Sequence, residues 1–427
     1  IIIMKKLTIF LLLIISANLY AQVDYDKYFT SKTMRFDYNR AGNSTGNSIF
    51  FEQIKEEPYW SGKKTSLLDK FEYGHYKFLV YDVNSNTLIY SRGYNTLFDE
   101  WQSTPEAKVL SRTFYETVIF PYPKNKVKIE LHERKRDGNF EKQYEQIIDP
   151  LDKFIKKEKP LNLPVLEVVN NGNPMEKVDL VFLPDGYSQD EMDQFTADVR
   201  TYTDYLFGCS PFKENKDRFN IWAVLSPSME SGVDNPGTTK WKNNLFGMTY
   251  YTQDVERYLM SGEIKTIRDY AALTPYDNIL IISNSDLYGG GAIYNYYTSF
   301  PNKNKNGDYL IVHEFGHNFC ALGDEYYTSE VGVDEYYNLN VEPYEANLTT
   351  LVNFGKKWKS MMESKTPIPT PSTNEYKSVL GVYEGGGYVP KGIFRPKQDC
   401  TMKSISYDNF CPVCKKALND MIDYYAE

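Results

Sequence analysis

Residues 313–317 read His-Glu-Phe-Gly-His, and this pattern constrains the chain more than any other. On an α-helix, four residues advance the backbone by just over one turn, so His313 and His317 project from the same face. Two imidazoles placed in this way can share one Zn²⁺, and Glu314 beside them can take a proton from a water molecule. The pattern therefore predicts a helix that carries a metal-dependent hydrolytic site. The alternative is a helix with two histidines that only satisfy local hydrogen bonds.

The third protein ligand of such a metal must come from outside the helix, because a catalytic zinc site needs three protein ligands and one open position. The chain has only four histidines, and the other two, His75 and His132, lie far upstream. A carboxylate is therefore expected. Asp324 is the preferred candidate, since it follows Gly323, which can turn the chain back toward the helix. The remaining carboxylate candidates are Glu325, Glu330, Glu335 and Glu345.

Residues 1–21 have the pattern of a secretory signal peptide. Two lysines follow Met4, an apolar stretch covers residues 7–15, and small residues lead to Ala21, where we expect cleavage. We therefore expect an exported protein, in the periplasm, at the cell surface or outside the cell. No later stretch is long and apolar enough to span a bilayer, so stable membrane insertion is not expected. The net charge of −9 and the pI near 5.3 argue against a nucleic-acid partner.

The chain is long enough for two domains, and its pattern changes near residue 153. Residues 22–152 contain short runs of β-branched and aromatic residues separated by turn signals, which predicts an antiparallel β-sandwich. Residues 153–164 are rich in lysine and proline and are predicted to be a linker. Residues 165–427 are predicted to form an α/β domain, so the overall class is α+β. Its expected elements are strands at 177–183, 219–225 and 278–283 and a helix at 188–207.

Tyrosine is unusually abundant, with 37 residues. Aromatic rings pack well in β-rich cores, which is the simpler explanation. The alternative is that the N-terminal domain uses exposed rings to contact a glycan or a protein.

A run of glycines lies just upstream of the histidine helix, where residues 289–294 read Gly-Gly-Gly-Ala-Ile-Tyr. Glycine allows another backbone to approach closely. We therefore expect a strand at the edge of a cleft, with Gly290 and Gly291 contacting an extended substrate.

Residues 313–326, from His313 to Tyr326, resemble the active-site signature of the IgA peptidase family of metzincins. Stretches at 178–187, 230–234, 383–388 and 400–402 also resemble blocks of that family. The resemblance implies that Asp324 completes the zinc site, that Met402 forms the Met-turn beneath the metal, and that an extra β domain precedes the peptidase domain. Tyr407 is a candidate oxyanion donor, as in some metzincins, although a buried core tyrosine is the simpler explanation. One departure is Cys320, which stands where metzincins usually carry glycine, so we expect the turn at Gly323.

Five cysteines in an exported chain favour disulfides, and Cys411 and Cys414 lie close to Cys400 in sequence. Cys209 would be left over or would pair elsewhere. The alternative is a structural metal held by Cys320, Cys400, Cys411 and Cys414, similar in placement to the four-cysteine zinc site of archaemetzincins.

Together these patterns predict an exported, zinc-dependent endopeptidase that acts on protein or peptide substrates, with Glu314 as its general base. The competing hypothesis is a surface module that binds glycan or protein and carries a vestigial metal site. An intact set of His313, Glu314, His317 and Asp324 argues against it, because a binding module has no use for Glu314. The substrate itself is not specified by the sequence.

Overall fold

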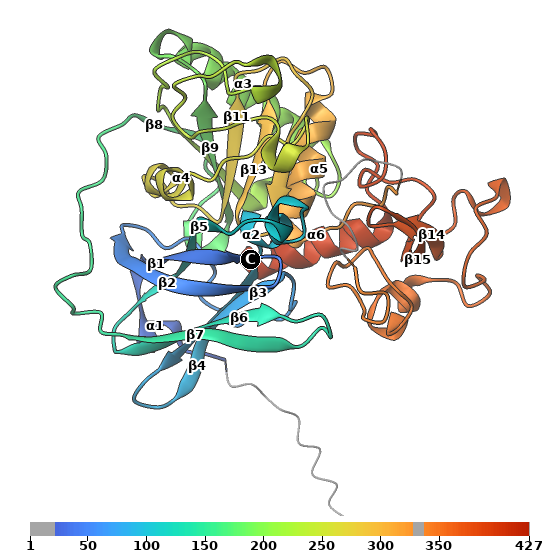
Figure 1. The fold of residues 1–427 in the computed structure, drawn as a ribbon, viewed down its shortest axis with the longest axis horizontal. Helices are drawn as coiled ribbons and strands as arrows, with labels where there is room; N and C mark the ends of the chain where they lie inside the picture. Colours follow the sequence, from blue (N-terminus) through green and yellow to red (C-terminus); the bar gives the residue numbers. More distant parts are fainter. Residues whose placement is uncertain (1–21, 328–336, 427) are drawn as a thin grey trace, which may run out of the picture.

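The computed structural model describes residues 22–327 and 337–426 (Figure 1). Its N-terminal part contains two antiparallel sheets, as predicted. One has the order β2 (Gly46–Glu57), β1 (Phe29–Asn43), β5 (Arg112–Pro123), and the other has the order β4 (Thr87–Tyr94), β3 (Tyr76–Asp82), β6 (Val127–Arg134), β7 (Phe140–Ile148). Two short helices, α1 (Tyr25–Tyr28) and α2 (Leu97–Gln102), flank these strands.

The two sheets share one apolar core. Alternate residues of β3 are buried, as the two-residue period of a strand requires. Phe78 of β3 and Phe120 of β5 meet across the sheets with their ring centroids 6.3 Å apart. Tyr38 and Tyr94 are also fully buried, and their hydroxyl groups hydrogen-bond to each other at 2.7 Å. These rings support the packing explanation for the abundant tyrosines.

The predicted linker, residues 153–164, contains no helix or strand in the structure. It is nevertheless attached to the N-terminal domain, because the backbone of Lys156 exchanges hydrogen bonds with Ile54 and Glu56 of β2. Beyond it, β8 (Val165–Val169) begins a second, mixed sheet.

This second sheet has the order β12 (Gly291–Ile293), β13 (Tyr297–Pro301), β11 (Asn278–Ser283), β9 (Val178–Asp185), β10 (Phe219–Val224), β8. The four inner strands are parallel, whereas β8 and β12 run antiparallel at the two edges. The predicted strands at 177–183, 219–225 and 278–283 are therefore confirmed. The predicted helix at 188–207 is α3 (Met192–Gly208), preceded by one 3-10 turn.

Both faces of the sheet are covered, because every residue of β9 is buried. Leu180 and Phe182 share a core with α3 and α5 (Gly307–Cys320). Val181 and Leu183 point to the opposite face and share a core with α4 (Ile264–Ala271). The histidine helix α5 is thus packed against one face of this sheet (Figure 1).

The C-terminal segment adds the hairpin β14 (Tyr383–Gly386) and β15 (Val389–Arg395) and ends in α6 (Pro412–Tyr425). Helix α6 runs from the hairpin toward the N-terminal domain (Figure 1). Nine short 3-10 helices complete the described structure: Glu106–Lys108, Pro174–Glu176, Gln189–Glu191, Lys216–Arg218, Pro236–Thr238, Thr252–Asp254, Phe354–Lys356, Trp358–Met361 and Asn374–Tyr376.

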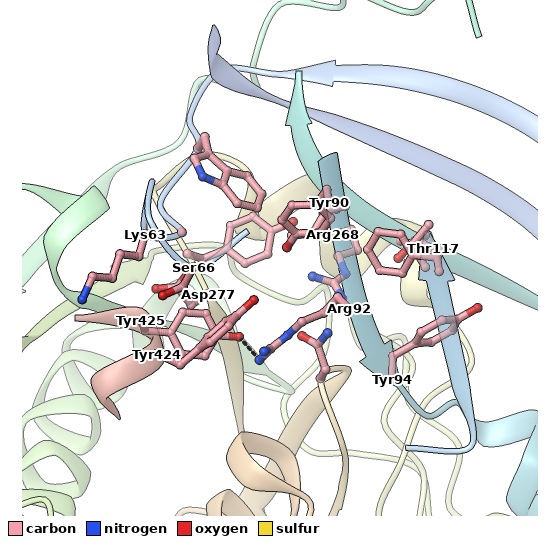
Figure 2. Close-up of a pocket in the computed structure, with 17 residues that line it drawn as sticks. Lys63, Ser66, Tyr90, Arg92, Tyr94, Thr117, Arg268, Asp277, Tyr424 and Tyr425 are labelled. Atoms are coloured by element: carbon pink, nitrogen blue, oxygen red, sulfur yellow. Dashed lines mark hydrogen bonds between the residues drawn. The ribbon is translucent and has the colours of Figure 1, made fainter. Parts of the chain in front are cut away.

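The two domains are joined by polar contacts, and residues of both line a small cavity of about 40 Å³ (Figure 2). Arg92 of β4 donates a hydrogen bond to the hydroxyl of Tyr425 at the end of α6. Nearby, Ser61 donates to the carbonyl oxygen of Tyr276 at 2.7 Å. Arg35 and Lys55 of the β domain both form ion pairs with Asp269 of α4. Within residues 22–327 and 337–426, no helix is long and apolar enough to cross a membrane.

Candidate metal centre

His313 and His317 lie one turn apart on α5, and their Nε2 atoms are 3.2 Å from each other. The helix holds them in place because its other faces are packed, with Ile311, Val312 and Phe315 all fully buried. His313 itself is almost completely buried, and His317 is partly buried. The i, i+4 spacing therefore brings the two imidazoles together as predicted.

Backbone carbonyls orient both rings. Nδ1 of His313 lies 3.0 Å from the carbonyl oxygen of Thr401, and the hydroxyl of Tyr309 lies 3.1 Å from the same nitrogen. Nδ1 of His317 hydrogen-bonds to the carbonyl oxygen of Leu322. A carbonyl can only accept, so in each ring Nδ1–H is the donor and the lone pair lies on Nε2. When both rings are neutral, both lone pairs are therefore available at the shared position.

The chain leaves α5 at Ala321, not at Gly323 as the sequence predicted. Ala321 has the left-handed conformation, with φ 51° and ψ 41°. The N–H groups of Ala321 and Leu322 donate to the carbonyls of His317 and Gly316, which satisfies the last turn of the helix. Gly323 serves a different purpose. A Cβ atom there would lie 2.5 Å from Cδ1 of Leu348, so the absence of a side chain permits close packing.

Asn347 fixes the backbone immediately before Asp324. Its side chain accepts from the N–H of Gly323 and donates to the carbonyl of the same residue, each at 2.8 Å. These two hydrogen bonds position Asp324 beside the histidines. Its Oδ1 atom lies 3.3 Å from Nε2 of His313 and 3.4 Å from Nε2 of His317. The hydroxyl of Tyr388 donates to Oδ2 of the same carboxylate.

The electrostatics of Asp324 favour an anion. Burial opposes ionisation, but the two imidazoles outweigh it and hold the pKa of Asp324 well below its usual range. Oδ1 is nevertheless buried without any hydrogen-bond partner. A buried carboxylate oxygen without a donor is costly, and a cation would satisfy it.

The three ligand atoms fit a tetrahedral zinc ion. With metal–ligand bonds of about 2.0–2.1 Å, tetrahedral geometry separates nitrogen and oxygen ligands by roughly 3.3–3.4 Å. The triangle formed by His313, His317 and Asp324 has sides of 3.2, 3.3 and 3.4 Å. These residues can therefore hold one ion and leave a fourth position open.

The other two histidines and the other acidic candidates within the described residues have different partners. His75 and His132 lie in the β domain beside Glu133 and Glu130. Glu345 lines the cavity beside the three ligands, but its carboxylate accepts a hydrogen bond from Tyr337 at 3.0 Å. Glu325 points to a separate cluster of cysteines. Glu330 and Glu335 fall outside the described residues.

Beside the ligands lies a cavity of about 200 Å³ that contains Glu314 in its wall. Burial raises the pKa of Glu314 above its ordinary value. Gly290 and Gly291 also line the cavity, where β12 forms the edge of the sheet as predicted. A Cβ atom on Gly290 would lie 3.3 Å from Oε1 of Glu314, so this glycine leaves room for the carboxylate.

Met402 lies beneath the helix and is fully buried. Its sulfur would be 3.2 Å from a Cβ atom on Gly316, so the glycine inside the histidine motif permits this close contact. Tyr407, in contrast, does not reach the cavity. Its hydroxyl donates to the carbonyl of Tyr205 on α3 at 2.6 Å, which agrees with the simpler explanation of a packed tyrosine.

Several residues around the site were not predicted. Tyr388 and Arg257 line the cavity, and the β domain contributes Asn95 and Glu100 to the same wall. Tyr309 precedes His313 by four residues, so helical spacing alone indicates their contact. Nothing local in the sequence connects Asn95 or Glu100 to residues more than two hundred positions away.

The cysteines are all buried free thiols, so the expected disulfides are absent. Cys320 also differs from prediction, because its sulfur contacts the carbonyl of Gly316 and lies apart from the other three.

Comparison with known proteins agrees with the site. The model of the family described as IgA Peptidase M64 matches residues 166–378 and 372–422, more than half of the chain. A second model, described as Peptidase M64 N-terminus, matches residues 24–145. No curated protein matches the chain. The N-terminal match covers the β domain, and the other match covers the part of the chain that begins with β8.

Proposed function

The chain belongs to the IgA peptidase M64 family and is thus a peptidase, and we propose that it is an exported, zinc-dependent endopeptidase of metzincin type. One observation supports this more than any other. His313, His317 and Asp324 present three ligand atoms within 3.2–3.4 Å of one another, and Glu314 lies in the wall of the adjoining cavity.

Zinc held at this position would supply Lewis-acid polarisation of a substrate carbonyl and of a water molecule. Glu314 then acts as the general base. Its carboxylate accepts the proton of the attacking water and returns it to the leaving amine. The raised pKa of Glu314 suits both proton transfers, because the carboxylate must hold the proton taken from water and then release it to the amine.

The substrate is a peptide segment that enters the cavity along the edge strand β12. Gly290 has a positive φ of 156°, and a side chain there would meet Glu314, so the bare backbone at Gly290 can lie close to the reacting bond. Arg257 supplies a cation in the same wall.

Export rests on the leader pattern at residues 1–21, which lie outside the described residues. Sequencing the N-terminus of the protein recovered outside the cytoplasm tests it. The expected first residue is Gln22.

Digestion of a peptide mixture tests the catalytic proposal, with His317→Ala as the decisive variant and His132→Ala as its control. His132 is a half-buried histidine in the β domain that contacts Glu130, so its loss should leave cleavage unchanged. His317→Ala should lose zinc from the catalytic site and lose cleavage. Cleavage by His317→Ala at the wild-type rate would overturn the proposal.

A further inference from the structure

Four ionisable side chains meet in the core below the catalytic site. They are Glu325, just after α5; Cys400, in the turn before Met402; and Cys411 and Cys414, at the start of α6. All four are buried, and their ligand atoms lie within 4.8 Å of one another. We propose that this Cys/Glu cluster binds a second zinc ion, which is structural and distinct from the catalytic one.

The distances within the Cys/Glu cluster fit a metal site. The sulfur of Cys414 lies 3.5 Å from that of Cys411 and 3.8 Å from that of Cys400. Oε1 of Glu325 lies 3.4 Å from the sulfur of Cys414. A tetrahedral zinc ion with Zn–S bonds of about 2.3 Å holds its sulfurs about 3.8 Å apart, and its sulfur and oxygen ligands about 3.6 Å apart. A disulfide requires about 2.05 Å between sulfurs, so these thiols are not bonded to each other.

One carboxylate oxygen of Glu325 lacks a hydrogen-bond partner, and a bound cation would account for its burial. Oε1 accepts a hydrogen bond from the side chain of Asn347 at 3.0 Å, but Oε2 is buried without any partner. Three thiols in an apolar core offer no strong donor to a carboxylate. Burying this group without compensation is costly, whereas coordination of a metal would satisfy it.

The local backbone supports thiolate ligands. The N–H of Cys411 points to the sulfur of Cys400 at 3.3 Å, and the N–H of Cys414 points to the sulfur of Cys411 at 3.4 Å. Such donors stabilise negative charge on sulfur. Cys411 is also the N-cap of α6, where the helix dipole favours an anion.

The ligand types indicate zinc in a structural role. Three thiolates and one carboxylate complete a four-coordinate shell, which leaves no position for water or substrate. Among the residues that line the catalytic cavity in the described structure, none belongs to the Cys/Glu cluster. The second ion would instead tie together three segments that support the first site, since Glu325 follows Asp324 and Cys400 is close to Met402.

Metal analysis of the full-length protein tests this proposal independently of catalysis. We expect two zinc ions per chain in the wild type and one in a His313→Ala/His317→Ala variant. X-ray absorption of that variant should show three sulfur neighbours at about 2.3 Å and one oxygen. A variant that binds no zinc, or that shows only nitrogen and oxygen neighbours, would overturn the proposal.

Two matched cysteine variants and a thiol titration of the wild type provide a second test. The titration remains informative even if a variant fails to fold. Cys320→Ser should keep both ions, because Cys320 is equally buried but lies outside the Cys/Glu cluster. Cys414→Ser should lose the second ion. The wild type, denatured in a chelator without reductant, should titrate as five free thiols. Three thiols would indicate a disulfide and would contradict a metal site.

Discussion

The backbone N–H of Glu325 donates a hydrogen bond to the carbonyl oxygen of Met402 at 2.8 Å. This bond joins the segment that carries Asp324 to the turn that lies beneath the histidine helix. The next carbonyl toward the N-terminus, that of Thr401, orients His313. The candidate metal centre is therefore assembled from two segments that are distant in sequence, and its geometry depends on how closely they pack.

Gly323→Ala should disturb this packing. The new methyl group would lie 2.5 Å from Cδ1 of Leu348, so the backbone before Asp324 must move. We expect a loss of roughly 1–3 kcal/mol in the free energy of unfolding, as for other overpacked sites, together with weaker zinc binding. Gly355→Ala is the control, because a methyl group there would meet no atom within 4 Å. Chemical denaturation and competition with a chelator measure both effects, and equal values for the two variants would refute this role of Gly323.

Tyr388→Phe should weaken the catalytic metal site without removing a ligand. The substitution keeps the ring but deletes the hydroxyl that donates to Oδ2 of Asp324. Loss of such an orienting partner typically lowers metal affinity about 10-fold or more. Tyr407→Phe also deletes one hydroxyl but only breaks a bond to the carbonyl of Tyr205, so zinc affinity and kcat should not change. A drop in kcat for Tyr407→Phe alone would restore the oxyanion role that the structure argues against.

Asp269 should make the docking of the two domains sensitive to acid. Burial opposes its ionisation, but Arg35 and Lys55 outweigh it and lower the pKa of Asp269 to about 2. In the unfolded chain its pKa is about 3.9, so the ion pairs stabilise the fold above about pH 4 and are lost as the pH falls toward 2. The expected contribution is about 1 kcal/mol, because the carboxylate is partly exposed and solvent screens it.

Asp269→Asn tests this contribution by denaturation as a function of pH. The stability difference from the wild type should be present at pH 6 and should shrink below about pH 4. Asp420→Asn is the control, since the ion pair of Asp420 lies within α6, with Lys416 one turn earlier. A difference for Asp269→Asn that does not vary between pH 6 and pH 3 would show that the ion pairs do not contribute.

Much of the site could be predicted because its signals are local. The spacing of His313 and His317 requires only helical geometry, and the shortage of other histidines left a carboxylate as the third ligand. The central strands were equally clear, because a parallel strand covered on both faces has a continuous apolar sequence. Asp324 was the best candidate among several acidic residues, and in the structure its carboxylate lies 3.3–3.4 Å from both histidines.

The expectations that differ from the structure depended on distant contacts. Glycine is the usual residue at a left-handed helix end, so Gly323 was the expected turn, yet the chain turns at Ala321 and Gly323 is needed against Leu348. Tyr407 is close to Met402 in sequence, but its hydroxyl points to α3. Disulfides were expected because the spacing of the cysteines does not reveal that Glu325 completes a group with three of them.

The most direct test of the central claim is peptide hydrolysis by Glu314→Gln, measured together with the zinc content of the same preparation. Glu314 is not among the three candidate ligands, so the variant should keep the full zinc content of the wild type. It should lose at least about 100-fold in kcat, the typical contribution of a general base. Glu375→Gln, an exposed substitution, should behave as the wild type. A zinc-loaded Glu314→Gln variant that cleaves peptides at a rate close to the wild type would contradict the account.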